Sequence, residues 1–459
     1  MARWAWLAAA VMAGLALAWF SASTPAPLSA DAPPLVFSAG RAMADIRIVA
    51  KAPHPTGSPE NAAVRDYLVA RLGAMGLSPR VQRAASEGGT VENVLAMLPG
   101  RDHAKPALAL MAHYDSAPSS PGAADDATGV AAVLETVRAL KAAGSPVRDV
   151  VLVLTDGEEP GLLGARAFFG QDPLAKHIGL AINLEARGGA GRAMMFETGA
   201  DNGGLIDLLR RNAALPFSNS LAVFLYKLLP NDTDFTVAKA SGVTGFNFAF
   251  IGRQIDYHAP SSTPEALDQG AVQSTGDQAL AIAQAVAFAN DLPAPQPDVV
   301  YSHVFGDLVL AYPSWGGWLL LAATAALLIV AALASRRRAP FRGLDLARGA
   351  VAPLVIIVLA ALLLYAARHA TGIGFGFPAQ RPLLARIELW ELTLALIDGL
   401  AIMIAAKLLG AGGGARTAAT WLGMLITGFV VAVVLQIAHP LVALLFSWPM
   451  AAAALAAAM

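Results

Sequence analysis

Three short apolar runs decide the fold: PALALMAHYD at 106–115, DVVLVLTDG at 149–157 and IGLAINLEA at 178–186. Each is apolar at successive positions, as expected of strands buried on both faces of a largely parallel sheet. Helical stretches lie between them, TGVAAVLETVRALKAAG at 128–144 and GLLGARAFFG at 161–170. This alternation predicts an α/β domain, with a mostly parallel central sheet flanked by helices on both sides.

The α/β pattern extends over residues 37–292, which we expect to form the catalytic domain. Before it, residues 4–20 form an uncharged apolar run preceded by Arg3. This is the layout of a signal anchor, here assigned to residues 1–22, or of a cleavable secretory signal peptide. Residues 23–36 are rich in Pro, Ala and Ser and lack a helical period, so we expect them to form a linker.

The remainder of the chain has the composition of a membrane domain. After a second expected linker at 293–313, four long apolar runs are followed by a fifth that starts at Leu441. The four runs lie at 315–334, 350–367, 389–409 and 417–437. They predict an all-α transmembrane domain of about five helices at 314–459.

A cluster of arginines predicts the orientation of these helices. The loop after the first run carries Arg336, Arg337, Arg338, Arg342 and Arg348. The positive-inside rule places this loop in the cytoplasm. Counting crossings backward then puts the α/β domain outside and the N-terminus inside.

Composition agrees with a lipid-bilayer partner and excludes several classes of function. The 459 residues carry a formal net charge of -1 and are 56% hydrophobic but only 14% charged. Near neutrality argues against a nucleic-acid partner. Without cysteine, the chain has no disulfides, thiolate ligands or cysteine nucleophiles, so a metal must be held by His, Asp and Glu. The lack of cysteine and the frequent Ala suit a bacterial inner-membrane protein with a periplasmic catalytic domain, and a eukaryotic lumen satisfies the same physics.

Acidic and imidazole side chains follow several of the predicted strands, where open α/β sheets place their ligands. They are His113 and Asp115, Asp125 and Asp126, Glu158 and Glu159, Glu185, and Tyr257 and His258. Asp115 lies two residues after His113, so we expect it to orient that imidazole. We expect Asp126 to serve as a helix N-cap.

These residue types suit zinc in a hydrolytic site, because zinc takes nitrogen and oxygen ligands and leaves a position open for water. With two metals in reach, a carboxylate can bridge them. Successive side chains diverge at a strand end, so one of two adjacent glutamates can bind metal while the other acts as general base.

Five motifs resemble the zinc aminopeptidases of metallopeptidase family twenty-eight, and within it the membrane-bound members with a lumenal or periplasmic catalytic domain. The motifs are PHPTGS at 53–58, HYDS at 113–116, GAADDATG at 122–129, DGEE at 156–159 and DYH at 256–258. The resemblance spans roughly residues 42–288. It implies a peptidase with two zinc ions that acts on extracytoplasmic peptides.

The resemblance also implies roles for single residues. His113 and Glu185 would bind one zinc, and Glu159 and His258 the other. Asp125 would bridge the two ions. Glu158 resembles the general base, and Tyr257 matches a tyrosine that stabilises the tetrahedral intermediate in some relatives, although it is equally explained as a packed aromatic. Many members carry Asp in place of Glu185, but NLEARG at 183–188 is similar to the membrane-bound branch.

Two other functions stay open at this point. A glutaminyl cyclase has a similar domain with one zinc and acts on an N-terminal Gln or Glu. A catalytically inactive peptide-binding scaffold is the third reading, although such relatives lose ligands that this chain keeps. NDTDF at 231–235 also resembles the membrane-bound branch, without a role that we can assign to Asp232 or Asp234. Nothing in the sequence indicates an oligomeric state.

Overall fold

The computed structural model describes residues 2–86, 89–213, 215–304, 308–338, 342–409 and 415–458. The chain divides into two compact units, Met1–Ala311 and Tyr312–Met459, which we call unit 1 and unit 2. Unit 1 contains the expected catalytic domain, and unit 2 contains the expected membrane helices.

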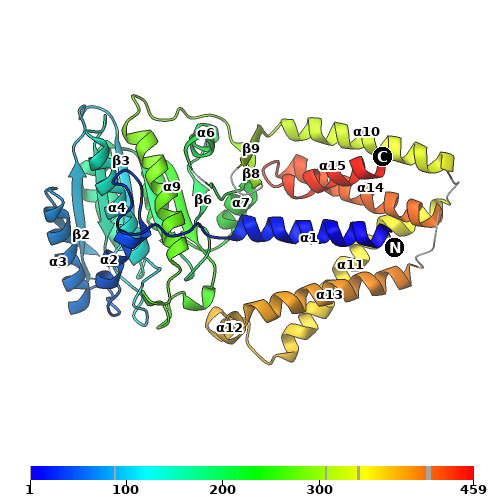
Figure 1. The fold of residues 1–459 in the computed structure, drawn as a ribbon, viewed down its shortest axis with the longest axis horizontal. Coiled ribbons are helices and arrows are strands. Elements are labelled where there is room, and N and C mark those ends of the chain that lie inside the picture. The colour runs from blue at the N-terminus through cyan, green and yellow to red at the C-terminus, as the bar shows by residue number, and fades with distance from the viewer. Residues whose placement is uncertain are drawn as a thin grey trace. The chain divides into compact units, whose positions relative to one another are not determined.

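A seven-stranded mixed sheet forms the centre of unit 1, in the order β1-β2-β4-β3-β5-β7-β6 (Figure 1). The pairs β4–β3, β3–β5 and β5–β7 are parallel, whereas β1–β2, β2–β4 and β7–β6 are antiparallel. The strands are β1 Arg80–Ser86, β2 Gly89–Leu98, β3 Ala107–His113, β4 Val150–Thr155, β5 Ile178–Ala186, β6 Met194–Thr198 and β7 Thr244–Phe250. The predicted fold class is therefore confirmed, with antiparallel strands at the edges of a parallel centre.

Helices cover both faces of this sheet, as the apolar strands require. One face packs on α2, α3, α4, α6 and α9, the other on α5 and α8. The helices of unit 1 are α1 Ala2–Ala22, α2 Ala39–Val49, α3 Pro59–Ala74, α4 Ala127–Ala143, α5 Leu163–Gln171, α6 Gly203–Asn212, α7 Ser220–Leu228, α8 Asp234–Ala240 and α9 Gln269–Ala287. Short 3-10 helices occupy Pro173–His177 and Gln254–Asp256.

Strand alternation decides which face carries the chemistry. In β3, Leu108 and Leu110 join the core under α4 and α9, whereas Ala109 and Met111 join the core under α5 and α8. His113 lies two residues after Met111, so it belongs to the α5/α8 face.

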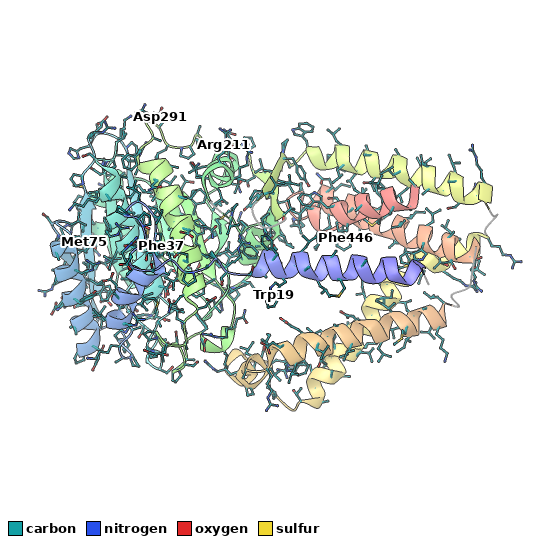
Figure 2. The ribbon with its side chains drawn as sticks, in the orientation of Figure 1. Trp19, Phe37, Met75, Arg211, Asp291 and Phe446 are labelled. Atoms are coloured by element: carbon teal, nitrogen blue, oxygen red, sulfur yellow. The ribbon has the colours of Figure 1, made fainter. Side chains whose placement is uncertain are left out.

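Residues 23–36, expected as a linker, lie along the surface of unit 1 without regular structure. We call this segment the N-terminal strap. Arg41 donates to the carbonyls of Ala30 and Ala32 at 2.9 and 2.7 Å. Gln273 of α9 accepts from the N–H of Leu28 at 2.9 Å. Immediately after the strap, Phe37 is fully buried in the core (Figure 2). Side chains of the domain thus fix the path of the strap.

Residues 293–313, also expected as a linker, contain two strands. β8 (Val299–Val304) and β9 (Leu308–Pro313) form a separate two-stranded sheet. β8 is joined to the segment around α7 by the bridge between Asn219 and Ser302.

Beyond the end of β9, the described part of unit 2 consists of helices joined by turns. Its helices are α10 Gly316–Arg338, α11 Gly343–Ala370, α12 Phe377–Leu384, α13 Ile387–Leu408, α14 Ala415–Ala438 and α15 Leu444–Ala458. Four of them, α10, α11, α13 and α14, are long and apolar enough to cross a bilayer, and α15 is a shorter apolar helix. The chain is therefore a multi-pass membrane protein.

Small residues let α11 and α14 approach closely. A Cβ atom on Gly349 would lie 2.0 Å from the carbonyl oxygen of Thr420, and one on Gly423 would lie 2.2 Å from that of Leu346. Thr427 adds a hydrogen bond of 2.8 Å to the carbonyl of Ala350. Such contacts are typical of membrane helices, whose association depends on close packing and interhelical hydrogen bonds.

Candidate metal centre

The sequence-predicted site residues meet where β3, β4 and β5 end, because parallel strands present their carboxyl ends at one edge. His113 ends β3, and Glu185 is the penultimate residue of β5. Glu158 and Glu159 follow β4 after a turn at Gly157, whose φ of 72° favours glycine. Asp125 and Asp126 precede α4, and Tyr257 and His258 follow the 3-10 turn after β7.

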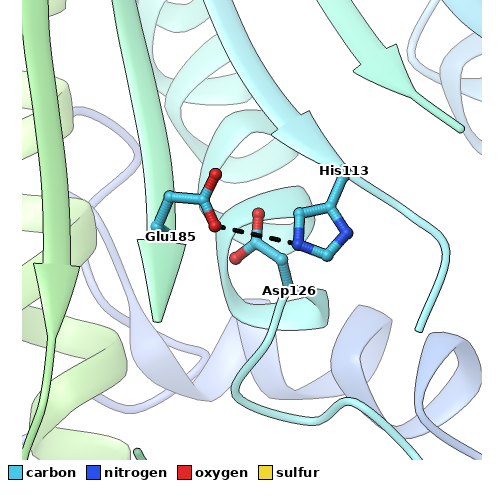
Figure 3. A group of neighbouring side chains, drawn as sticks. All are labelled: His113, Asp126 and Glu185. Carbon is cyan, nitrogen blue, oxygen red and sulfur yellow. Dashed lines mark ion pairs between the residues drawn. The ribbon is translucent and has the colours of Figure 1, made fainter. Parts of the chain in front are cut away.

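The first group of potential metal ligands consists of His113, Asp126 and Glu185 (Figure 3). All three are buried, and each offers a ligand atom within 4.8 Å of the others. The Nε2 atom of His113 lies 3.7 Å from Oε2 of Glu185.

Asp125, Glu159 and His258 form the second group, again with ligand atoms within 4.8 Å of one another. Nε2 of His258 lies 3.0 Å from Oε2 of Glu159 and 3.1 Å from Oδ2 of Asp125.

Asp125 connects the two groups through its two carboxylate oxygens. Oδ1 lies 3.0 Å from Nε2 of His113, while Oδ2 faces His258. Burial alone would raise the pKa of Asp125, but hydrogen bonds with the two imidazoles lower it to about 2. A carboxylate with one oxygen toward each group has the arrangement required of a bridging ligand.

Asp126 does more than the helix N-cap that we expected. Its Oδ1 accepts from the N–H of Gly129 at 2.9 Å, as an N-cap does. Its Oδ2 is buried without a hydrogen-bond partner among the described residues, and the same carboxylate belongs to the first ligand group. The adjacent acids in GAADDATG were the available signal, but the capping pattern explained Asp126 without a metal.

Asp115 holds several parts of the site together. Its carboxylate accepts from the N–H of Glu158 at 3.1 Å, from the N–H of Glu159 at 3.3 Å and from the hydroxyl of Thr56 at 3.0 Å. It also lies 3.4 Å from Nδ1 of His113. Nδ1 donates to the Asp115 carbonyl at 3.0 Å, because a carbonyl can only accept. Nε2, the atom that faces the other ligands, is then the one available to a metal.

Crowding of buried acids perturbs the titration of the site. Burial raises the pKa of Glu158 well above its usual range; His113 opposes this rise and Glu185 adds to it. Burial likewise raises the pKa of Glu185; the nearby His113 lowers it, and the nearby Asp126 raises it further. For His258, burial acts downward, but hydrogen bonds with Asp125 and Glu159 raise its pKa to about 9.

This donor set fits metal ions. Glu159 Oε1 and Asp126 Oδ2 are buried without hydrogen-bond partners among the described residues, although buried carboxylate oxygens normally have them. Carboxylates outnumber imidazoles in both groups taken together, so cations would compensate the buried negative charge. Imidazole and carboxylate donors without thiolates suit zinc.

Tyr257 stacks on the ligand candidate beside it. Its ring centroid lies 3.8 Å from that of His258, with an interplanar angle of 23°. Arg187 makes a second contact with the Tyr257 ring, and its guanidinium lies 5.2 Å from the ring centroid. The structure therefore places Tyr257 at the site as a packed ring.

A buried polar chain supports Glu185, and sequence reasoning did not find it. Asn183 donates to Oε1 of Glu185 at 3.1 Å and to Asn247 at 3.0 Å. Asn247 in turn donates to Glu197, which pairs with Lys239. Asn at 183 and 247, inside otherwise apolar strands, was the signal available in the sequence.

The two remaining motifs have different placements. In PHPTGS, the N–H of His54 donates to the hydroxyl of Ser116 at 2.8 Å, and the hydroxyl of Thr56 donates to the carboxylate of Asp115. This turn therefore contacts the loop that follows His113. In NDTDF, Asp232 is exposed. Asp234 is buried and accepts from Thr155, the neighbour of His113 in the sheet.

Fold and site together define a class: an α/β domain with two adjoining groups of metal-ligating side chains at the carboxyl edge of its sheet. A family model described as Peptidase family M28 matches residues 93–283, which include every ligand candidate. The chain therefore contains a Peptidase family M28 domain, and the family predicted from the motifs is confirmed.

Two curated relatives extend the comparison. Over 232 residues the chain is 35% identical to endoplasmic reticulum metallopeptidase 1 of Mus musculus, covering 49% of this chain and 26% of the mouse protein. It is 34% identical over 230 residues to the vacuolar membrane protease of Candida dubliniensis, covering 47% of this chain and 24% of that protein. The matched region thus spans about a quarter of the length of these relatives.

Among solved structures, the aminopeptidase from Aneurinibacillus sp. strain AM-1 is similar at 14% identity with a TM-score of 0.47. The match covers 57% of this chain and 97% of that structure.

Proposed function

We propose that this protein is a membrane-anchored zinc aminopeptidase that removes N-terminal residues from extracytoplasmic peptides. The observation that carries the proposal is Asp125, whose two oxygens lie 3.0 and 3.1 Å from the two imidazoles of separate ligand groups. A shared carboxylate between two groups favours two metal ions over one.

Each ion would have its own ligands from the chain. His113 and Glu185 would hold one zinc ion, Glu159 and His258 the other, and Asp125 both, with Asp126 close to the first. Bound zinc would supply Lewis acidity toward a peptide carbonyl and lower the pKa of a water molecule. Asn183 and Asp115 keep Glu185 and His113 oriented through the hydrogen bonds described above.

Glu158 is the proposed general base. It lies beside the ligand Glu159, its N–H is fixed by Asp115, and burial raises the pKa of its carboxyl. A carboxyl with a raised pKa accepts a proton from water and returns it to a leaving amine more readily than an ordinary one. Tyr257, packed on His258, is the proposed donor to the tetrahedral intermediate.

The exopeptidase part of the proposal is supported by the five motifs, which resemble those of zinc aminopeptidases. The arginine-rich loop after α10 supports a catalytic domain outside the cytoplasm, which we propose to be the periplasm of a bacterial inner membrane.

Zinc content and hydrolysis of aminoacyl amides test the proposal. We expect two zinc ions per chain and turnover of free, but not N-acetylated, aminoacyl amides. Glu158→Gln should lower kcat by about 10²–10⁴ and keep both ions. Glu265→Gln, at an exposed acid outside the two ligand groups, is the matched control.

Three outcomes would overturn the proposal. Full activity in Glu158→Gln would show that Glu158 is not the general base. A single zinc with loss of ammonia from an N-terminal Gln would indicate a cyclase. Tight peptide binding without turnover in metal-loaded protein would indicate a scaffold.

A further inference from the structure

Helix α7 carries an apolar surface that no described residue of unit 1 covers. Leu225, Leu228 and Leu229 are 49%, 66% and 55% exposed, and we call them the α7 leucines. Their spacing of three and four residues puts them on one side of the helix. Ser220 and Val223 are buried on the other side. Contiguous exposed leucines in a folded domain mark a contact surface.

Strand β8, which is hydrogen-bonded to the segment before α7, is followed by β9 and then by a candidate membrane span. The N–H of His303 in β8 donates to the carbonyl of Ser218 at 2.9 Å, which fixes β8 to the start of the α7 segment. β9 pairs with β8 and ends at Pro313, and the candidate span α10 begins at Gly316. An extended chain covers at most about 3.6 Å per residue, so the end of β9 lies within roughly 11 Å of the start of α10.

A second connection leads from α7 to α1, the predicted anchor. One amino group of Arg192 donates to the carbonyl of Ser21, in the last turn of α1, at 2.7 Å. The other amino group donates to the carbonyl of Leu215, in the segment that precedes α7. Near this end of α1, Trp19 is 80% exposed (Figure 2). Tryptophan is enriched at the boundary between lipid and water.

We propose that the α7 leucines insert into the head-group and upper acyl region of the bilayer leaflet that faces unit 1. The β8–β9 connection to α10 and the hydrogen bonds of Arg192 to Ser21 and Leu215 hold α7 near that leaflet, and the exposed surface of α7 is apolar. Lys227, exposed between Leu225 and Leu228, extends toward the lipid phosphates with its alkyl stem against lipid. Leucines with a neighbouring lysine are the pattern of helices that lie in the interface plane.

The position of α7 bears on the site. Residues 229–233 separate α7 from α8, which begins at the buried Asp234 close to His113 and Glu158. Membrane insertion of α7 therefore holds a segment adjoining the ligand groups at the lipid surface. Resting on the proposed peptidase activity, this makes peptides attached to or partitioned into membranes the preferred substrate class.

Lipid contact can be tested without any enzyme activity. Because the chain has no cysteine, Leu228→Cys introduces a single thiol for an environment-sensitive fluorophore. The full chain is reconstituted in phosphatidylcholine vesicles with and without phosphatidylcholine that carries a spin label on acyl carbon 5. We expect strong quenching by the spin-labelled lipid at position 228, and the same at Leu225→Cys.

Ile48→Cys is the matched control, since Ile48 is 47% exposed on α2, a helix separate from α7 in unit 1 (Figure 1). Its label should be quenched by aqueous iodide and not by the lipid. Equal lipid quenching at 48 and 228 would overturn the proposal. A blue-shifted fluorescence emission of the label at position 228 without quenching by the spin-labelled lipid would also overturn it. A protein surface, such as that of a second copy of the chain, would then cover α7.

The substrate inference has a separate test. The double variant Leu225→Glu and Leu228→Glu should lower kcat/KM by about tenfold or more for a lipid-tethered peptide in vesicles, because charged side chains oppose insertion. The same peptide without its lipid should be cleaved as in the parent. An equal loss for both peptides would contradict the membrane role. If the parent cleaves neither peptide, the peptidase proposal fails while the quenching result still decides the position of α7.

Discussion

The carboxylate of Asp115 accepts a hydrogen bond of 3.1 Å from the main-chain N–H of Glu158. It thereby joins the loop after β3, which follows the metal-ligand candidate His113, to the loop after β4, which carries the proposed base. Asp115→Asn keeps the size of the side chain but replaces one acceptor oxygen with a donor. We expect zinc affinity to fall by about 10- to 100-fold, as when other outer partners of metal ligands are removed. Titration with a competing chelator measures this change.

Asp66→Asn is the matched control, because Asp66 is 70% exposed in its side chain. It should bind zinc as the parent does. Unchanged affinity in Asp115→Asn would show that His113 and the two loops are held without this carboxylate.

Zinc binding should release protons at neutral pH. The pKa of His258 is raised to about 9, so this imidazole is protonated at pH 7 before metal binds, and the pKa of His113 is raised as well. Because zinc requires the neutral imidazole, apparent zinc affinity should rise with pH up to about 9. Isothermal titration calorimetry in buffers of different ionisation enthalpy measures the released protons.

The variant His258→Gln should release about one proton fewer than the parent. Binding heats that do not depend on the buffer at pH 7 would contradict the protonation of His258.

Asp277, on α9 away from the ligand groups, should make stability fall as pH rises. Burial raises its pKa to about 6, against an opposing hydrogen bond from Gln273. In an unfolded chain an aspartate titrates near 3.9, so between about pH 4 and 6 the folded state binds more protons than the unfolded state. This contribution to stability is present below pH 4 and is lost as pH rises through 6.

Asp277→Asn removes the titrating group and keeps an acceptor for Gln273. We expect the free energy of unfolding at pH 7 to increase by about 1–2 kcal/mol relative to the parent, with little difference at pH 4. Unfolding curves of both proteins at the two pH values measure this change, and Asp31→Asn, at an exposed aspartate, should show neither effect. A gain that is equal at both pH values would point to a cause other than titration.

Close packing of α11 on α14 should make Gly423 intolerant of a side chain. The Cβ of Gly423→Ala would lie 2.2 Å from the Leu346 carbonyl oxygen, so the helices must separate. We expect a loss of about 1–3 kcal/mol, the range for overpacked sites. Thermal unfolding of the purified protein in detergent, followed by helical circular dichroism, measures the loss.

Gly399→Ala is the matched control, since a Cβ there meets nothing within 4 Å. It should be neutral or slightly stabilising, because alanine favours a helix over glycine. If both variants behave alike, helix propensity and not packing explains the result.

The strands and the site order were predictable because they depend on local patterns. The run VVLVLT at 150–155 is apolar at successive positions, and LAINLEA at 180–186 is apolar except at Asn183 and Glu185, as expected of strands with two buried faces. Once a parallel sheet is inferred, the edge on which His113, Glu159 and Glu185 meet follows from strand direction alone.

What could not be predicted depends on contacts between distant segments. Asp126 satisfied a capping pattern, and its place among the potential metal ligands is seen only when β5 brings Glu185 beside it. The link from Asn183 to Asn247 requires the register between β5 and β7. Likewise, the Pro- and Ala-rich composition of residues 23–36 predicted a tether, because a linear pattern does not show that Arg41 and Gln273 bind its main chain.

The N-terminal strap has a consequence for biogenesis. The N–H of Leu28 bonds to Gln273, a residue 245 positions further along the chain, and that of Ala39 to the same side chain across 234 positions. During synthesis the strap emerges long before α9, so its docking must wait until nearly the whole domain has been made. Contacts of such long sequence separation also form slowly. The strap is therefore made before the rest of the domain but is among the last segments to reach its final place.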